Sequence, residues 1–101
     1  MHELSEQFTE AWSPRDIAKI NEFVIRAAKF DGAYHWHKHD EEDELFLVFR
    51  GKITIQTESV DVNLEQGEGV KIPKDIEHRL VALEPSFVLM FESLKLKSKG
   101  D

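Results

Sequence analysis

Short segments typical of β-strands, separated by turn-forming residues, fill most of the chain from Glu22 onward. They combine β-branched, aromatic and alternating polar residues, and they cover residues 23–25, 33–38, 45–49, 52–57, 60–64, 70–72, 77–81 and 87–91. The breakers between them include Asp31-Gly32, Arg50-Gly51 and Glu84-Pro85. Such regular spacing predicts an all-β fold, an antiparallel sandwich or barrel.

The first part of the chain has a different pattern. Four apolar residues follow helical spacing, namely Leu4, Phe8, Ala11 and Trp12. Ser13 then resembles an N-cap and Pro14 a first helical residue, which predicts a second short helix over residues 15–20. We therefore expect an N-terminal helical segment (1–21), a β-barrel (22–94) and a solvated tail (95–101).

Charge and composition exclude several classes of partner. Against 13 Lys and Arg stand 20 Asp and Glu, so the net charge of -7 repels nucleic acid and anionic membranes. The chain has no cysteine, which rules out disulfides and thiolate metal sites. Its first residues lack the basic and apolar regions of a signal peptide, and its longest apolar runs are too short to span a bilayer. We expect a cytoplasmic protein.

Two of the expected strands, residues 45–49 and 87–91, are apolar at every position. A sheet with one solvated face does not need this, so both faces of these strands are expected to be buried. One face can point into the barrel. The other, carrying Leu45, Leu47 and Phe49, predicts a homodimer that hides it.

Histidines gather in one expected strand. His35, His37 and His39 alternate, so they should share one face. If residues 40–43 form a hairpin loop, Glu44 lies opposite His39, and Phe46 and Val48 lie opposite the other two histidines. His78 comes from a distant strand and shares its face with Leu80. Closure of the sheet would bring three imidazoles and one carboxylate around one metal ion.

Two spaced motifs strengthen this interpretation. The first is Gly32-x4-His37-x-His39-x4-Glu44-x6-Gly51, and the second is Gly67-x5-Pro73-x-Asp75-x2-His78. Together they resemble the two motifs of the cupin superfamily, with a short connection as in its small single-domain members. Two departures are Asp75 in place of a glycine and Ala82 in place of a common asparagine. Asp tolerates the left-handed backbone conformation, so Asp75 can serve the same turn.

The resemblance implies an antiparallel jelly-roll barrel, also called a double-stranded β-helix, here with short N-terminal helices. It also implies that His37, His39, Glu44 and His78 hold one divalent transition metal ion, with Fe, Mn, Ni and Zn as candidates. The alternative is that the histidines are unrelated and are satisfied by nearby backbone groups. Any one of them alone would favour that alternative, whereas the complete set favours a metal.

The leading hypothesis for function is a metal-dependent enzyme of the dioxygenase or isomerase type that acts on a small organic molecule. The residues expected to line the pocket or to support the metal ligands are His35, Phe46, Val48 and Leu80. No inward cluster of Lys or Arg is expected, which argues against a phosphorylated sugar. The sequence assigns no catalytic residue, because fold alone does not select a reaction. The competing hypothesis is a non-catalytic barrel that binds a metal or a small metabolite.

Overall fold

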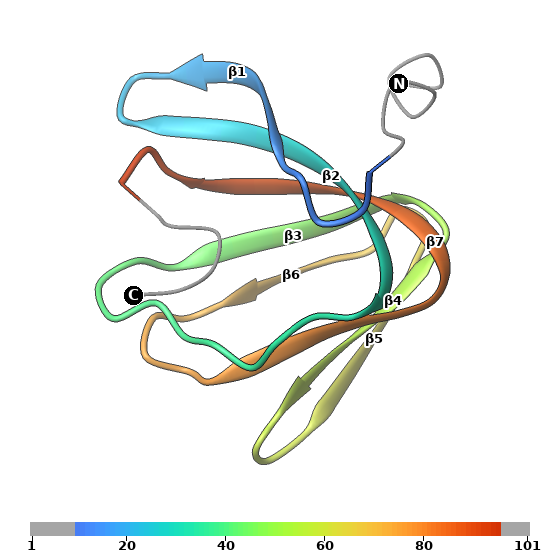
Figure 1. Cartoon of the computed structure of the whole chain (residues 1–101). Helices are drawn as coiled ribbons and strands as arrows, with labels where there is room; N and C mark the ends of the chain where they lie inside the picture. Colours follow the sequence, from blue (N-terminus) through green and yellow to red (C-terminus); the bar gives the residue numbers. More distant parts are fainter. Residues whose placement is uncertain (1–9, 96–101) are drawn as a thin grey trace.

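The computed structural model describes residues 10–95, which form seven β-strands and no helix. The strands are β1 (Arg15–Ile20), β2 (Phe23–Ala33), β3 (Glu44–Arg50), β4 (Lys52–Thr57), β5 (Asp61–Glu65), β6 (Gly69–Ile72) and β7 (His78–Ser93). All strand pairs are antiparallel. The expected all-β, jelly-roll-like barrel is confirmed, and Figure 1 shows the strands curving around a shared interior.

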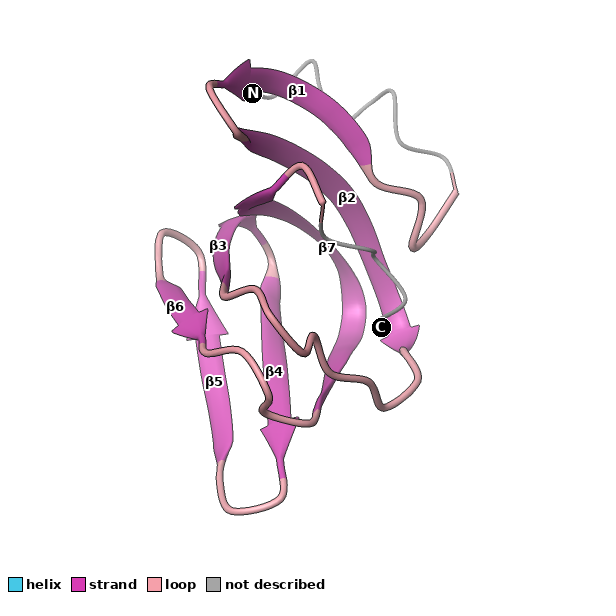
Figure 2. Ribbon diagram, turned by 90° about the vertical axis from the view of Figure 1, so that its left-hand side faces the viewer, coloured by secondary structure: helices cyan, strands magenta, loops and turns pink. Residues whose placement is uncertain are grey.

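The sheet is organised around the long strand β7. Its second half lies between β2 and β3, and its first half pairs with β4. The strand order is β1-β2-β7-β3-β6, with β5 joined to β4. Figure 2 shows β7 bending between these two sets of partners. The break expected at Pro85 does not end the strand. Pro85 lies between two stretches of β7 that pair with β2, at a point where the pairing is irregular and no backbone N–H is needed as a donor.

The expected helix over residues 15–20 is wrong. This segment is the edge strand β1, which pairs with β2 from Arg15 opposite Ala27 to Ile20 opposite Phe23. Every residue of β1 is exposed, so burial imposes no periodicity on the segment, and hydrogen bonding to the free edge of β2 determines its conformation. Of the expected earlier helix, Leu4 and Phe8 lie outside the described residues, and Ala11 forms an isolated bridge with Lys29.

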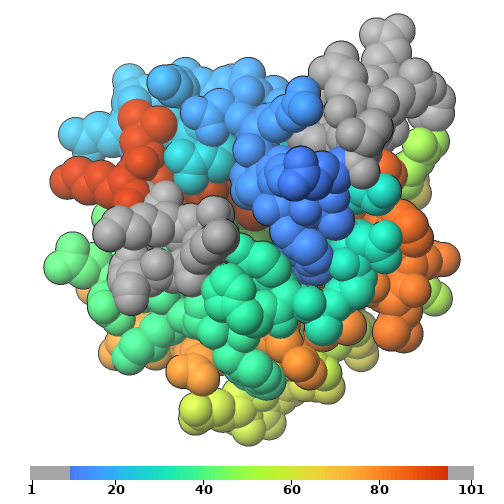
Figure 3. All heavy atoms as spheres, in the orientation of Figure 1, coloured from blue at the N-terminus to red at the C-terminus, as the bar shows by residue number. Residues whose placement is uncertain are grey.

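The core lies inside the barrel and consists of alternate residues of the strands. Along β3 and the second half of β7, three inward pairs face each other, namely Glu44 with Glu92, Phe46 with Met90, and Val48 with Val88. Ile55 and Leu80 form a similar apolar pair between β4 and the first half of β7. The space-filling view in Figure 3 shows the outside of this closed unit. No helix in residues 10–95 is long and apolar enough to cross a membrane.

Candidate metal centre

Four side chains come together at one end of the barrel interior. The four are His37, His39, Glu44 and His78, and one ligand atom from each lies within 4.8 Å of all the others. The exposed fractions are 8% for His37, 3% for His39, 5% for Glu44 and 1% for His78. Such a buried group of three imidazoles and one carboxylate fits a first-row divalent metal ion.

The two segments that carry the ligands are joined through their backbones. The N–H of His37 donates to the carbonyl of His78 at 3.0 Å, and the N–H of His78 donates back at 2.9 Å. One turn away, Asp75 donates its N–H to the carbonyl of His39 at 2.7 Å. Asp75 adopts φ 69°, which confirms that it takes the left-handed conformation expected from the motif. The turn before β7 thus fixes the histidine segment beside His78.

The expected register of the histidine segment is wrong. Strand β2 ends at Ala33, and residues 34–43 contain only an isolated bridge, at His37. Strand β3 pairs with β6 and β7, so His39 is not across a hairpin from Glu44 and Val48 does not pair with His35. His39 nevertheless reaches Glu44, with 3.4 Å between Nε2 and Oε1. His39 is held near Glu44 by the hydrogen bond between its carbonyl and the N–H of Asp75, and not by strand pairing.

Backbone contacts leave ligand nitrogens available. His37 and His78 each donate Nδ1–H to a nearby carbonyl, of His35 at 3.1 Å and of Ile76 at 2.8 Å. Their Nε2 atoms are then left with a lone pair. Nε2 of His78 and Oε1 of Glu44 are fully buried and have no hydrogen-bond partner. Buried polar atoms are normally satisfied, so these two atoms support a bound ion at this point.

Burial keeps two of the imidazoles, those of His37 and His78, neutral. Burial, together with the neighbouring His78 and His39, lowers the pKa of His37 to about 4, although the contact with the carbonyl of His35 acts in the opposite direction. Burial also lowers the pKa of His78. Neutral imidazole is the form that binds metal, so the site is prepared for an ion at neutral pH.

Glu92 is a buried residue at this site that the sequence did not reveal. It pairs directly with Glu44 across β3 and β7 and is 3% exposed. Burial and contact with Glu44 raise its pKa to about 9, against the opposing effect of Arg26. A signal was present, because Val88, Met90 and Glu92 alternate and should share the inward face. The strand was expected to end at residue 91, two residues before its end at Ser93.

A small cavity of about 20 Å³ lies beside His37 and Glu44, enough for about one water molecule. Its lining contains no Lys or Arg and consists of Trp12, Pro14, Ala28, Phe30, Tyr34, His37, Glu44, Phe46, Leu80 and Met90. Of the expected pocket residues, Phe46 and Leu80 line it. Val48 is buried farther along the barrel, and His35 is exposed with its ring centre 5.3 Å from that of His37.

Aromatic residues close the cavity on one side. The rings of Trp12 and Tyr34 stack with 4.8 Å between their centres, and Trp12 also stacks on Phe30 at 4.6 Å. The ring of Tyr34 meets His37 edge to face at 5.6 Å, and burial together with the charge of Glu44 raises the pKa of its hydroxyl. If residues 33–38 formed the regular strand expected from the sequence, Tyr34 would point away from the face that carries His35, His37 and His39. Strand alternation does not apply beyond Ala33, which is why that expectation fails.

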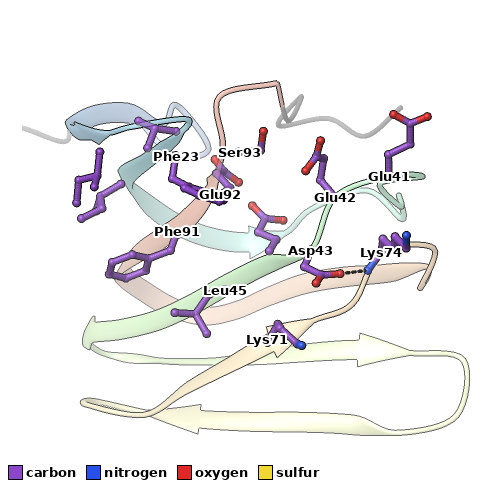
Figure 4. A pocket seen from close by; sticks show the side chains of 14 residues that line it. Phe23, Glu41, Glu42, Asp43, Leu45, Lys71, Lys74, Phe91, Glu92 and Ser93 are labelled. Atoms are coloured by element: carbon purple, nitrogen blue, oxygen red, sulfur yellow. Dashed lines mark hydrogen bonds between the residues drawn. The ribbon is translucent and has the colours of Figure 1, made fainter.

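A second and larger depression lies mainly on the outer surface. This groove of about 510 Å³ has apolar walls that include Phe23, Leu45 and Phe91, and charged residues at Lys71, Lys74 and the 41–43 loop. Figure 4 shows Asp43 accepting a hydrogen bond from the backbone of Lys74 at one side of the groove. Glu44 and Glu92 are also among the lining residues, so the groove borders the metal cluster.

Comparisons with known proteins agree with the geometry of the site. A family model described as the cupin domain matches residues 27–92. The chain belongs to the cupin family. It is 33% identical to a cupin-2 domain containing protein from Shewanella frigidimarina, whose crystal structure superposes with a TM-score of 0.88 over 91% of this chain and 90% of that one.

Two further relatives extend the comparison without naming an activity. An uncharacterized protein, YdbB of Bacillus subtilis, is 31% identical over 77 residues, which are 75% of this chain and 68% of the relative. The structure of NMB1881 from Neisseria meningitidis is 22% identical, with a TM-score of 0.83 over 91% of this chain and 94% of that one. At that identity, the second similarity shows the fold alone.

Proposed function

We propose that this cupin is a metal-dependent enzyme that acts on a small organic molecule, by oxygenation or isomerisation. One observation carries the proposal, the convergence of four buried ligand atoms within 4.8 Å of one another beside an apolar cavity. A binding barrel without a metal has no need to bury three imidazoles whose ring nitrogens face each other, because the desolvation of each is unfavourable. A divalent ion at this point offsets that cost.

The protein residues have separate tasks in this proposal. His37, His39 and His78 bind the ion as neutral ligands, and Glu44 contributes the single negative charge. When bound, an iron, manganese, nickel or zinc ion supplies Lewis acidity and coordination positions that the protein leaves open. Phe46, Leu80 and the Trp12–Tyr34 pair exclude bulk water from the adjoining cavity.

The lining of the cavity restricts the substrate. Because none of its residues carries a positive charge, a phosphorylated sugar would find no counter-ion there. We propose an uncharged or weakly charged molecule that attaches through an oxygen-bearing group to the ion and rests its apolar part on Phe46 and Leu80. His35, exposed next to His37, is proposed as a residue at the border of this site, and Val48 as support behind its wall.

The test has two stages. First, protein purified without added metal is submitted to elemental analysis, and about one transition ion per chain is expected. Second, the loaded protein is assayed for oxygen uptake and for conversion of keto acids, enediols and aldoses, with His37→Ala/His39→Ala as the inactive control. Turnover that depends on the metal supports the proposal. A stoichiometric ion with no turnover in either assay would favour the binding function instead.

A specific observation favours that second candidate, a non-catalytic barrel that binds a metal or a metabolite. The cavity beside the ligands holds only about one water molecule, so a larger substrate requires side chains to move. Calorimetric titration of the metal-loaded protein with small chelating acids distinguishes the two candidates. Binding without conversion identifies a binding protein.

We also propose that the outer face of the sheet joins two copies of the chain. Phe23 is 60% exposed and Phe91 36% exposed beside Leu45, which is a large apolar area for a free surface. The groove carries acidic residues at 41–43 and basic residues at Lys71 and Lys74, so two copies related by a two-fold axis can pair opposite charges. Sedimentation at several concentrations should show a dimer, and Phe91→Glu should give a monomer. A wild-type monomer at high concentration would contradict the interface.

A further inference from the structure

Four ionisable side chains form a row that crosses four neighbouring strands and ends at the metal cluster. The row runs from Asp16 on β1 through Arg26 on β2 and Glu92 on β7 to Glu44 on β3. Asp16 is paired in register with Arg26, and Glu92 with Glu44. Figure 1 shows these strands side by side in this order. Arg26 itself is paired with Met90 and Glu92 with Val24, so the row crosses the sheet with one diagonal step, from Arg26 to Glu92.

The central contact of the row is short. Arg26 Nη1 donates to Glu92 Oε1 at 2.9 Å, and Arg26 Nε donates to Asp16 Oδ1 at the same distance. Exposure falls along the row, since the side chain of Asp16 is 47% exposed, that of Arg26 16% and that of Glu92 1%. The positive charge of Arg26 thus lies between the surface and the interior, and Glu92 lies between Arg26 and the ligand Glu44.

One oxygen of the Glu44 carboxyl group belongs to the metal cluster. Oε1 lies 3.4 Å from Nε2 of His39 and has no hydrogen-bond partner, which places it on the metal side. Glu92 lies directly across from Glu44 in the pairing of β3 with β7, and both side chains are buried on the same inward face. Oε2 of Glu92 is likewise buried and has no hydrogen-bond partner. A buried carboxyl group at this position, itself held by Arg26, restricts the orientations open to the carboxyl group of Glu44.

Packing alone does not call for a glutamate at this position. The other inward residues of the same stretch of β7, Val88 and Met90, are apolar, and a buried carboxyl next to a second one is costly. We propose that Glu92, held by Arg26, is a positioning residue that orients Glu44 toward the bound ion. The inference rests on the proposed metal site, and it assigns Glu92 no contact with the ion. Partners of this kind typically change metal affinity when they are removed.

Three variants test the row. Glu92→Met replaces the carboxyl group beside Glu44 at similar size and removes its contact with Arg26. The Kd for Co²⁺ should therefore rise about 10- to 100-fold, with an altered visible absorption spectrum of the bound Co²⁺. Glu92→Gln keeps an amide donor toward Glu44 and an oxygen acceptor for Arg26. It should retain the wild-type spectrum and lose less than about tenfold in affinity. Asp16→Asn, the matched control, removes only the negative charge of the exposed partner of Arg26 and should change the Kd by no more than about fivefold.

The outcomes separate this inference from the proposal on which it rests. Co²⁺ affinity is measured by competition with a chelating dye, and circular dichroism checks that each variant is folded. If wild-type protein binds no Co²⁺, the metal site itself is wrong. If the wild type binds Co²⁺ and folded Glu92→Met binds it with the same Kd and spectrum, the metal site stands and the positioning role is wrong. If Glu92→Met does not fold, Arg26→Met replaces it as the test. Arg26→Met should then show the loss of Co²⁺ affinity that is expected of Glu92→Met.

Discussion

The two ends of the barrel interior are built on the same strands and have opposite chemistry. Along β3 and β7, the inward pair at one end is Glu44 with Glu92, and the inward pair at the other is Val48 with Val88. Both pairs are buried. The apolar pair gains free energy on burial, whereas the carboxyl pair loses it unless a ligand or a cation compensates. The apolar end of the core thus contributes stability, whereas the polar end holds the candidate metal site.

The largest expected effect removes the ligands from the polar end. His37→Ala/His39→Ala should abolish metal binding, because only Glu44 and His78 remain of the four ligands. The protein should stay folded, since the apolar end is intact. Elemental analysis and far-ultraviolet circular dichroism check the two statements. The control His35→Ala changes an exposed ring outside the cluster and should bind metal as the wild type does. If the double variant is unfolded, the ion has a structural role, and the polar end contributes to stability as the apolar end does.

The next effect truncates the apolar core at the pair that Ile55 forms with Leu80 between β4 and β7. Ile55→Ala, at a position with 0% exposure, should reduce the free energy of unfolding by about 2–5 kcal/mol. Metal affinity of the folded variant should stay close to that of the wild type, because Ile55 is not a lining residue of the cavity beside the ligands. Urea denaturation of metal-free protein measures the loss, with the exposed Val60→Ala as control. If Ile55→Ala lowers the free energy of unfolding no more than the control does, apolar packing inside the barrel is not what stabilises the fold.

The third test is the pH dependence of the metal-free protein. Folding raises the pKa of Glu92 from 4.5 to about 9, so the native state binds the extra proton and stability should fall as the pH rises through that interval. Folding lowers the pKa of His37 from 6.5 to about 4, so stability should fall as the pH drops through that interval. Urea denaturation in chelator at several pH values measures both slopes. Glu92→Gln should lose the alkaline decline, and an unchanged decline would exclude Glu92 as its source.

The same contrast explains which parts of the fold and site the sequence could predict. The apolar β3 and the positive φ of Asp75 follow from local patterns, and both are found. His37, His39, Glu44 and His78 were recognised from spacing, and the fold brings them together. These features depend on residue type at fixed intervals, which a sequence displays directly.

The misses come from pairing between distant segments. β1 is exposed along its whole length, so its sequence shows no pattern of buried and exposed residues. It is a strand because it pairs with β2. Tyr34 lines the cavity because the chain leaves the strand after Ala33, an event with no local signal. The role of Glu92 depends on its register against Glu44 and on its contact with Arg26. A two-residue error in the end of the strand was enough to hide it.

The central claim is that one ion binds at the polar end, and crystals soaked in Mn²⁺ or Co²⁺ test it directly through anomalous scattering. We predict one strong peak per chain, at coordination distance from a ring nitrogen of His37, His39 and His78 and from an oxygen of Glu44, about 2.0–2.2 Å for such ligands. A peak at any other place, or none at full soaking concentration, would contradict the account.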